Sequence, residues 1–223
     1  MSRVRGMIFD VDGVIADTEA LNARASVLMF RQLYGVEVQA EDFQPFVGTG
    51  DERYVQGVAE KYGVQIDTGK AVEQRRANFF ALLENEPLPA MPGVRELVLA
   101  ARESPLWRVA IATSGNKDKQ FPVITGTGLK LEWFDAVITG EDVTRKKPDP
   151  EIYLVTAKRL QIPAQRCVVF EDAPAGVAAA KAAGMACVAV TSSVPADQLT
   201  AADRVVESLA EVDLGELEAL VGD

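Results

Sequence analysis

The hydrophobic pattern predicts one strand near the start of the chain and alternating helices and strands from about residue 90 onward. Short apolar runs, typical of strands buried on both faces, occur at 3–9, 107–112, 135–138, 167–170, 186–190 and, more weakly, 204–206. Apolar residues at helical spacing lie between them, at 94–101, 150–160 and 174–183. Because strands that alternate with helices form parallel sheets, we predict an α/β fold with a doubly wound, Rossmann-like parallel sheet.

A purely helical stretch interrupts this alternation after the first strand. Helical spacing runs from Thr18 to a stop at Gly35, and it returns over 52–62 and 68–84. A proline cluster at 87–92 is typical of a linker. The stretch is therefore interpreted as a helical insertion.

The first strand has no partner of its own, so it must join the later sheet. The sequence then predicts one core domain of residues 1–15 and 90–223, with residues 16–89 inserted as a second domain. One segment stays open, because prolines and glycines interrupt the crossover helix expected over residues 119–129.

Composition excludes several classes of function. The net charge of −10 repels the phosphates of nucleic acids, so we do not expect a nucleic-acid partner. No apolar run approaches the roughly 20 residues of a membrane span, and no signal peptide is evident, so we expect a cytoplasmic protein without a membrane partner. The chain has no histidine, which excludes histidine-based acid–base catalysis and histidine-bound zinc. Its two cysteines lie in apolar runs and predict buried thiols.

Polar side chains capable of chemistry follow four of the predicted strands. Ligands of doubly wound sheets bind beyond the carboxyl ends of the strands. There the chain places Asp10 and Asp12, Thr113 and Ser114, Lys146 with Lys147, and Glu171 with Asp172. Carboxylates are rarely buried without a positive partner, so we expect these groups to meet around a cation.

The chemistry of this set indicates a metal and a phosphoryl group. Four acidic side chains in one place repel each other, and Mg²⁺, which prefers oxygen ligands, would neutralise them. A hydroxyl, backbone N–H groups and a lysine suit a phosphoryl group. One carboxylate can attack phosphorus to give an aspartyl phosphate, and a second one can give and later take the proton.

Four motifs, in this order, resemble those of the haloacid dehalogenase superfamily. They read DVDGVIADTE at 10–19, ATSGN at 112–116, KKPDPEIY at 146–153 and VVFEDAPAGVAAAKAAGM at 168–185. The subgroup resembled is that of the β-phosphoglucomutase-like phosphatases, whose helical cap is inserted just after the first motif. The resemblance implies a Mg²⁺-dependent phosphatase that acts on a small phosphorylated metabolite, with residues 16–89 as its cap domain.

The resemblance also implies a role for two acidic residues in each of the first and last motifs. Asp10 would be the nucleophile and a metal ligand. Asp12 would be the general acid and base, and its backbone carbonyl would bind the metal. Asp172 would be a direct metal ligand, with Glu171 in the second shell or acting through water.

The two middle motifs would hold the phosphoryl group. The resemblance assigns this role to Thr113, with Ser114 beside it, and to Lys147. Lys147 is chosen over Lys146 because it directly precedes Pro148, as the lysine of the family does.

A mutase of the β-phosphoglucomutase type is the main alternative. In that enzyme a lysine and an arginine in the cap turn bind a second phosphate, and a histidine follows the first motif. Here Val47 and Asp51 replace the basic pair, and Asn22 stands at the histidine position, while Arg53 offers partial compensation. We therefore favour hydrolysis of a monophosphate.

The sequence gives less support to three other functions: dehalogenase, phosphonatase and non-catalytic binding module. Dehalogenases of the superfamily lack the second aspartate, and phosphonatases need a cap lysine that forms a Schiff base. A non-catalytic binding module would be expected to have lost Asp10 or Asp12, and both are present. An enclosed site can work in a monomer, which we expect here. The substrate stays open, and candidate specificity residues are Glu19, Asn22, Gly48 and Arg53.

Overall fold

The computed structural model describes residues 4–47 and 49–221. The chain divides into two compact units. The core unit joins the chain up to Asp17 to the chain from Leu88 onward, and the helical unit is Thr18–Pro87. No helix among the described residues is both long enough and apolar enough to cross a membrane.

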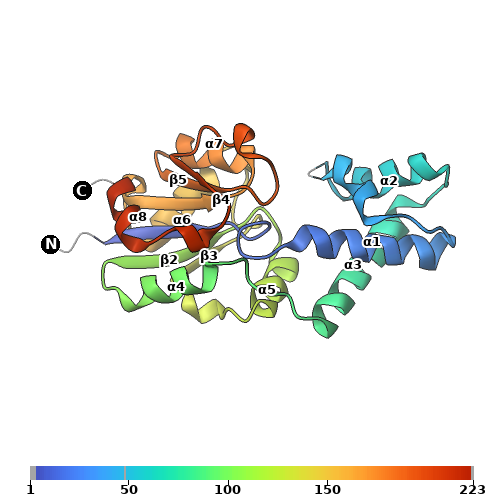
Figure 1. The fold of residues 1–223 in the computed structure, drawn as a ribbon, viewed down its shortest axis with the longest axis horizontal. Coiled ribbons are helices and arrows are strands. Elements are labelled where there is room, and N and C mark those ends of the chain that lie inside the picture. Colours follow the sequence, from blue (N-terminus) through green and yellow to red (C-terminus); the bar gives the residue numbers. More distant parts are fainter. Residues whose placement is uncertain (1–3, 48, 222–223) are drawn as a thin grey trace. The chain divides into compact units, whose positions relative to one another are not determined.

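The core unit is built on a parallel six-stranded sheet, which confirms the predicted fold class (Figure 1). Its order is β3-β2-β1-β4-β5-β6. The strands are β1 (Arg5–Phe9), β2 (Trp107–Ala112), β3 (Ala136–Ile138), β4 (Cys167–Glu171), β5 (Ala186–Val190) and β6 (Arg204–Val206). The first strand thus lies between β2 and β4, so the residue that follows it is delivered to the middle of the sheet edge.

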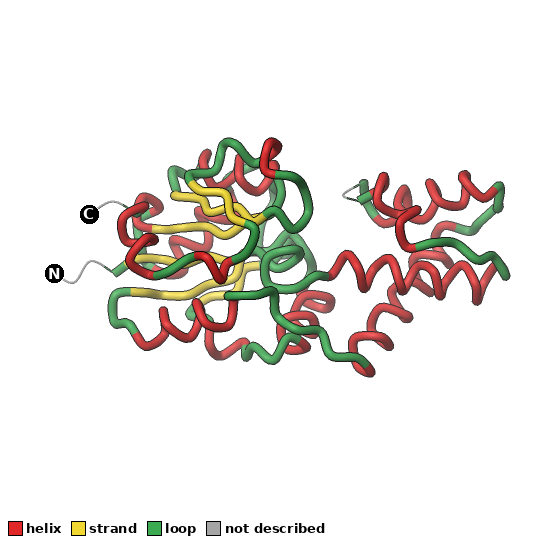
Figure 2. Tube along the Cα trace, in the orientation of Figure 1, coloured by secondary structure: helices red, strands yellow, loops and turns green. Residues whose placement is uncertain are grey.

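Helices cover both faces of this sheet (Figure 2). They are α4 (Val94–Glu103), α5 (Lys117–Gly126), α6 (Glu151–Leu160), α7 (Pro174–Ala182) and α8 (Leu214–Leu220). Ile8 lies beside Ala110 and Val169, in the core cluster that includes residues of α6 and α7. The next residue along each strand points to the opposite face, where the rings of Phe9 and Phe170 stack at 4.5 Å.

Two details differ from the sequence-based expectation or complete it. Glu171 belongs to β4 rather than following it, which holds its backbone in the sheet. The segment left open forms α5, which continues through Pro122 and ends at Gly126. Gly128 then adopts a positive φ of 79°, a conformation that glycine tolerates and other residues avoid. Both cysteines are buried, as predicted.

The helical unit contains α1 (Thr18–Tyr34), the 3-10 helix η1 (Ala40–Phe46), α2 (Asp51–Tyr62) and α3 (Thr68–Asn85). Its own apolar cluster includes Phe30, Phe43 and Val58. Phe43 stacks on Tyr54 with ring centroids 5.1 Å apart, which joins η1 to α2. The unit therefore has a hydrophobic core of its own.

Asp42 links η1 to α2 by charge-assisted hydrogen bonds. Its carboxylate accepts from the Tyr62 hydroxyl at 2.6 Å and the Gln39 backbone N–H at 2.9 Å, and it pairs with the ammonium of Lys61. The hydrogen bonds from Lys61 and Tyr62 lower the pKa of Asp42 to about 2. The charged form is therefore the one that the fold stabilises.

We expect Asp42→Asn to destabilise the helical unit at neutral pH and to do so less in acid. The depressed pKa contributes stability that is complete above the ordinary aspartate pKa and is lost as pH falls from about 4 toward 2. The deficit of the variant should be about 2 kcal/mol at pH 7 and should shrink below pH 4. Urea unfolding followed by circular dichroism at pH 7 and pH 3 measures it. Glu73→Gln, an equal change of charge at an exposed position of α3, is the matched control; a pH-independent deficit would contradict the expectation.

Candidate active site

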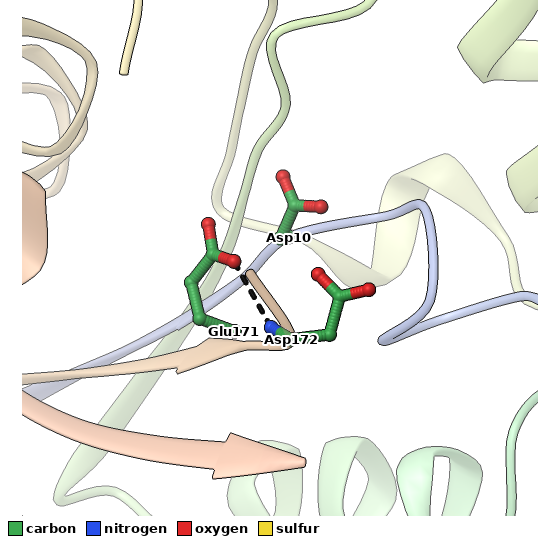
Figure 3. Close-up of side chains that lie close together, drawn as sticks. All are labelled: Asp10, Glu171 and Asp172. Atoms are coloured by element: carbon green, nitrogen blue, oxygen red, sulfur yellow. Dashed lines mark hydrogen bonds between the residues drawn. The ribbon is translucent and has the colours of Figure 1, made fainter. Parts of the chain in front are cut away.

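Three buried carboxylates meet at the carboxyl edge of the sheet (Figure 3). Asp10 follows β1, Glu171 ends β4 and Asp172 comes next. One oxygen from each lies within 4.8 Å of the others, and their residues are only 7%, 1% and 5% exposed. A set of carboxylate oxygens this close together fits a hard divalent cation such as Mg²⁺.

Lys147 joins two of these carboxylates. Its ammonium donates to Asp10 Oδ1 and to Glu171 Oε1, both at 2.6 Å, and lies 3.4 Å from the carbonyl oxygen of Ala112 at the end of β2. Its side chain is 10% exposed, whereas Lys146 is exposed. The structure therefore brings the predicted lysine, and not its neighbour, to the acidic cluster.

The pKa values in this cluster show competition between burial and charge. Burial raises the pKa of Asp10 well above its ordinary value, although Lys147 opposes the change. Burial and the charge of Glu171 raise the pKa of Asp172 to about 7. Burial also acts to raise the pKa of Glu171, but Lys147 and hydrogen bonds to the carboxylate lower it overall. One lysine thus leaves the three carboxylates with excess negative charge, which a cation would relieve.

Glu171 is held on both of its oxygens. Besides Lys147, Oε1 accepts from the hydroxyl of Tyr153 at 2.6 Å. Oε2 accepts from the backbone N–H groups of Asp172 at 3.0 Å and Ala173 at 3.2 Å. A Cβ on Gly176 would collide with this carboxylate, so the first turn of α7 packs directly on it. These contacts fix Glu171 as an anchor for Lys147.

Asp12 lies outside the three-carboxylate group. Its side chain is 40% exposed, and Oδ2 accepts from Gln120 Nε2 at 2.8 Å. The ammonium of Lys119 lies 3.6 Å from Oδ1. Both partners come from the first turns of α5.

The predicted hydroxyl pair follows β2, beside β1. Thr113 is buried, its N–H donates to Ile138 at 3.0 Å, and its Oγ1 accepts from the N–H of Gly115 at 3.2 Å. Ser114 is half-buried. The sheet therefore places this turn next to the strand that carries Asp10.

The candidate specificity residues lie in the helical unit. Glu19 accepts from the hydroxyl of Tyr54 at 2.7 Å, and the backbone carbonyl of Asn22 accepts from Ser26 at 2.8 Å. Arg53 pairs with Glu60 at 2.8 Å and stacks over the ring of Phe46. Gly48 lies outside the described residues.

Several residues near the cluster escaped the sequence-based prediction. Tyr153 is the last residue of the third motif, and its place in that motif was the available signal. Gln120 had none, because its segment shows no clear periodicity. Ser193 donates to Asp172, and Ser192 donates to the carbonyl of Gly13 at 2.6 Å, from a loop after β5 that no motif singled out.

Comparison with known proteins identifies the class. The family model described as haloacid dehalogenase-like hydrolase matches residues 4–184. The chain therefore belongs to the haloacid dehalogenase-like hydrolases, and it is an enzyme of the phosphoric monoester hydrolase kind.

Three similar proteins each align with most of this chain. Validoxylamine A 7'-phosphate phosphatase of Streptomyces hygroscopicus subsp. limoneus is 34% identical over 208 residues, which cover 92% of this chain and 94% of that protein. The crystal structure of CbbY from Rhodobacter sphaeroides in complex with phosphate is 28% identical, with a TM-score of 0.76, over 96% of this chain and 99% of that one. Protein SUPPRESSOR OF QUENCHING 1, chloroplastic, of Arabidopsis thaliana is 39% identical over 196 residues, 86% of this chain, but the match spans only 18% of that protein's length.

Proposed function

We propose that this chain is a Mg²⁺-dependent phosphatase that hydrolyses a small phosphorylated metabolite through an aspartyl phosphate on Asp10. The observation that carries the proposal is the buried lysine that bridges Asp10 and Glu171 beside Asp172, at the sheet edge where doubly wound folds bind ligands. The phosphatase relative and the phosphate complex of CbbY support the choice of substrate class.

The reaction would have two steps, transfer of the phosphoryl group to Asp10 and hydrolysis of the aspartyl phosphate. A carboxylate oxygen of Asp10 forms a bond to phosphorus while the bond from phosphorus to the leaving oxygen breaks, and Asp12 gives its proton to that oxygen. Water then attacks the phosphoryl group, Asp12 takes one of its protons, and the bond from Asp10 to phosphorus breaks to release phosphate. Thr113, with Ser114, and Lys147 would bind the phosphoryl oxygens.

The same carboxylates would hold the metal. Asp10 and Asp172 are the side chains that fit direct ligation, and the carbonyl of Asp12 would join them. Glu171 would act indirectly, because protein donors already engage both of its oxygens. When bound, Mg²⁺ would supply positive charge to the phosphoryl oxygens and to the carboxylates that hold it.

The helical unit would serve as the cap that excludes water and selects the substrate. Asp51, which replaces one of the two basic residues that bind a second phosphate in the mutase, is paired with Arg75 of α3. Its charge is therefore partly neutralised within the unit, so the product of the reaction is the observation that separates a phosphatase from a mutase.

The test is phosphate release from a panel of phosphomonoesters, with Mg²⁺ and with EDTA. We expect release with at least one small phosphorylated metabolite, loss of that activity in EDTA and recovery when Mg²⁺ is restored. The wild-type protein without substrate and Asp10→Asn with substrate provide the baselines. Metal-independent release, or no release from any ester of the panel, contradicts the proposal.

The mutase alternative is separated by its product. With β-glucose 1-phosphate as substrate, a phosphatase yields free phosphate and glucose, whereas a mutase yields an isomeric sugar phosphate. We expect free phosphate to account for the substrate consumed. An isomer as the main product would replace the phosphatase proposal by the mutase.

A further inference from the structure

Helix α5 supplies two contacts to the side chain of Asp12 within the core unit. The amide of Gln120 donates to Asp12 Oδ2 at 2.8 Å, and the ammonium of Lys119 lies farther away, 3.6 Å from Oδ1. The chain contains no histidine, so no imidazole can perform this task. The short hydrogen bond from an uncharged amide is therefore the most directional of these contacts.

Gln120 is an unusual residue for a fully buried position of a helix, because its side chain is polar. It is fully buried, and its Oε1 finds no hydrogen-bond donor in the described part of the chain. An unsatisfied buried oxygen destabilises a fold, so an apolar residue of the same size would be the more stable choice. The loss of stability caused by the unsatisfied Oε1 is explained if the Nε2 group of the same amide has a function.

The turn after β2 is shaped around the same amide. A Cβ on Gly115 would collide with the Gln120 side chain, so the absence of a side chain there leaves room for it. Gly115 follows directly on the pair Thr113 and Ser114. The backbone that the proposed phosphoryl site uses thus packs against the residue that holds Asp12.

We propose that Gln120 is the positioning residue of Asp12, and that its amide fixes the carboxyl group in the orientation from which it gives a proton to the leaving oxygen. This inference rests on the proposed function, because it assigns Gln120 to the residue given the acid role there. Gln120 itself need not touch the substrate; it acts through Asp12.

The leaving group provides a readout specific to this role. An alkoxide leaves as its bond to phosphorus breaks only if a proton arrives on its oxygen, whereas p-nitrophenolate is stable enough to leave without one. Misplacing Asp12 should therefore slow the hydrolysis of alkyl phosphates more than that of p-nitrophenyl phosphate. A general loss of structure would reduce both by the same factor, because it lowers only the amount of active enzyme.

The experiment compares Gln120→Met with wild type on glycerol 1-phosphate and on p-nitrophenyl phosphate, both with Mg²⁺. Methionine keeps the length of the side chain and removes the donor. We expect kcat/KM to fall at least about tenfold for glycerol 1-phosphate and no more than about threefold for the aryl ester. The melting temperature should be unchanged or raised, because the unsatisfied oxygen is removed too. Gln165→Met, the same substitution at an exposed site before β4, is the matched control and should behave as wild type.

Asp12→Asn distinguishes failure of this inference from failure of the proposed function. If Asp12→Asn shows the leaving-group dependence and Gln120→Met loses activity equally on both esters, or on neither, the positioning role is overturned and the acid role stands. If Asp12→Asn itself shows no such dependence, the acid role fails, and the positioning role fails with it. Should Gln120→Met not fold, Gln120→Leu, an apolar side chain that likewise has no donor for Asp12, gives the same comparison.

Discussion

Replacing Asp10 by asparagine should abolish phosphate release while leaving the fold intact. The amide has the shape of the carboxylate but cannot form the bond to phosphorus, so we expect kcat to fall by at least about 10⁴-fold. Lys147 keeps its second partner, Glu171, and burial already disfavours the charge of Asp10. The melting temperature without metal should therefore stay close to that of wild type.

The same substitution tests the covalent intermediate. Wild-type protein quenched in acid during turnover should carry the mass of one added phosphoryl group on the peptide that contains Asp10, and Asp10→Asn should carry none. Asp197→Asn, an identical change at an exposed position, is the matched control. If Asp10→Asn turned over substrate near the wild-type rate, the mechanism would be contradicted. Phosphorylation of another residue would instead identify that residue as the nucleophile.

The core sheet could be predicted because its strands depend on strong local patterns. The runs at 107–112 and 186–190 coincide with β2 and β5 residue for residue, since strands buried on both faces need continuous apolar sequence. The meeting of Asp10 with Lys147 and Asp172 followed from topology alone. Parallel strands end at the same edge, so residues far apart in sequence arrive together.

What the sequence did not reveal depends on contacts between side chains distant in sequence. Gln120 lies beyond Asn116, in a segment where Pro122 and two glycines hide the helical period, and nothing local marks it as a partner of Asp12. Tyr153 occupies a regular core position of α6, and only its hydroxyl, which meets Glu171 from a different strand, separates it from an ordinary apolar residue. Such pairs are fixed by tertiary packing, which no window of sequence contains.

Replacing Lys147 by methionine should damage both stability and activity, because this ammonium is the cation that hydrogen-bonds to both Asp10 and Glu171 among the described residues. Removing one partner from a buried ion pair leaves uncompensated charge and typically costs about 3–5 kcal/mol. We expect a loss of that size in the core unit, together with a fall in kcat/KM of at least about 100-fold, since the proposed contact with the phosphoryl group is lost as well. Methionine retains much of the aliphatic length, so the change is mainly one of charge.

Urea unfolding followed by tryptophan fluorescence measures the stability of the core unit, because both tryptophans, Trp107 and Trp133, lie in that unit. Lys146→Met is the matched control: the same substitution at the adjacent, exposed position should change neither stability nor activity. The metal gives a second readout. If Lys147 and Mg²⁺ both offset the charge of the same carboxylates, Mg²⁺ should raise the stability of Lys147→Met by more than it raises that of wild type. Equal stabilisation of the two proteins would mean that the cation does not bind at this cluster, and an unchanged free energy of unfolding without metal would mean that the buried lysine is not what keeps the carboxylates together.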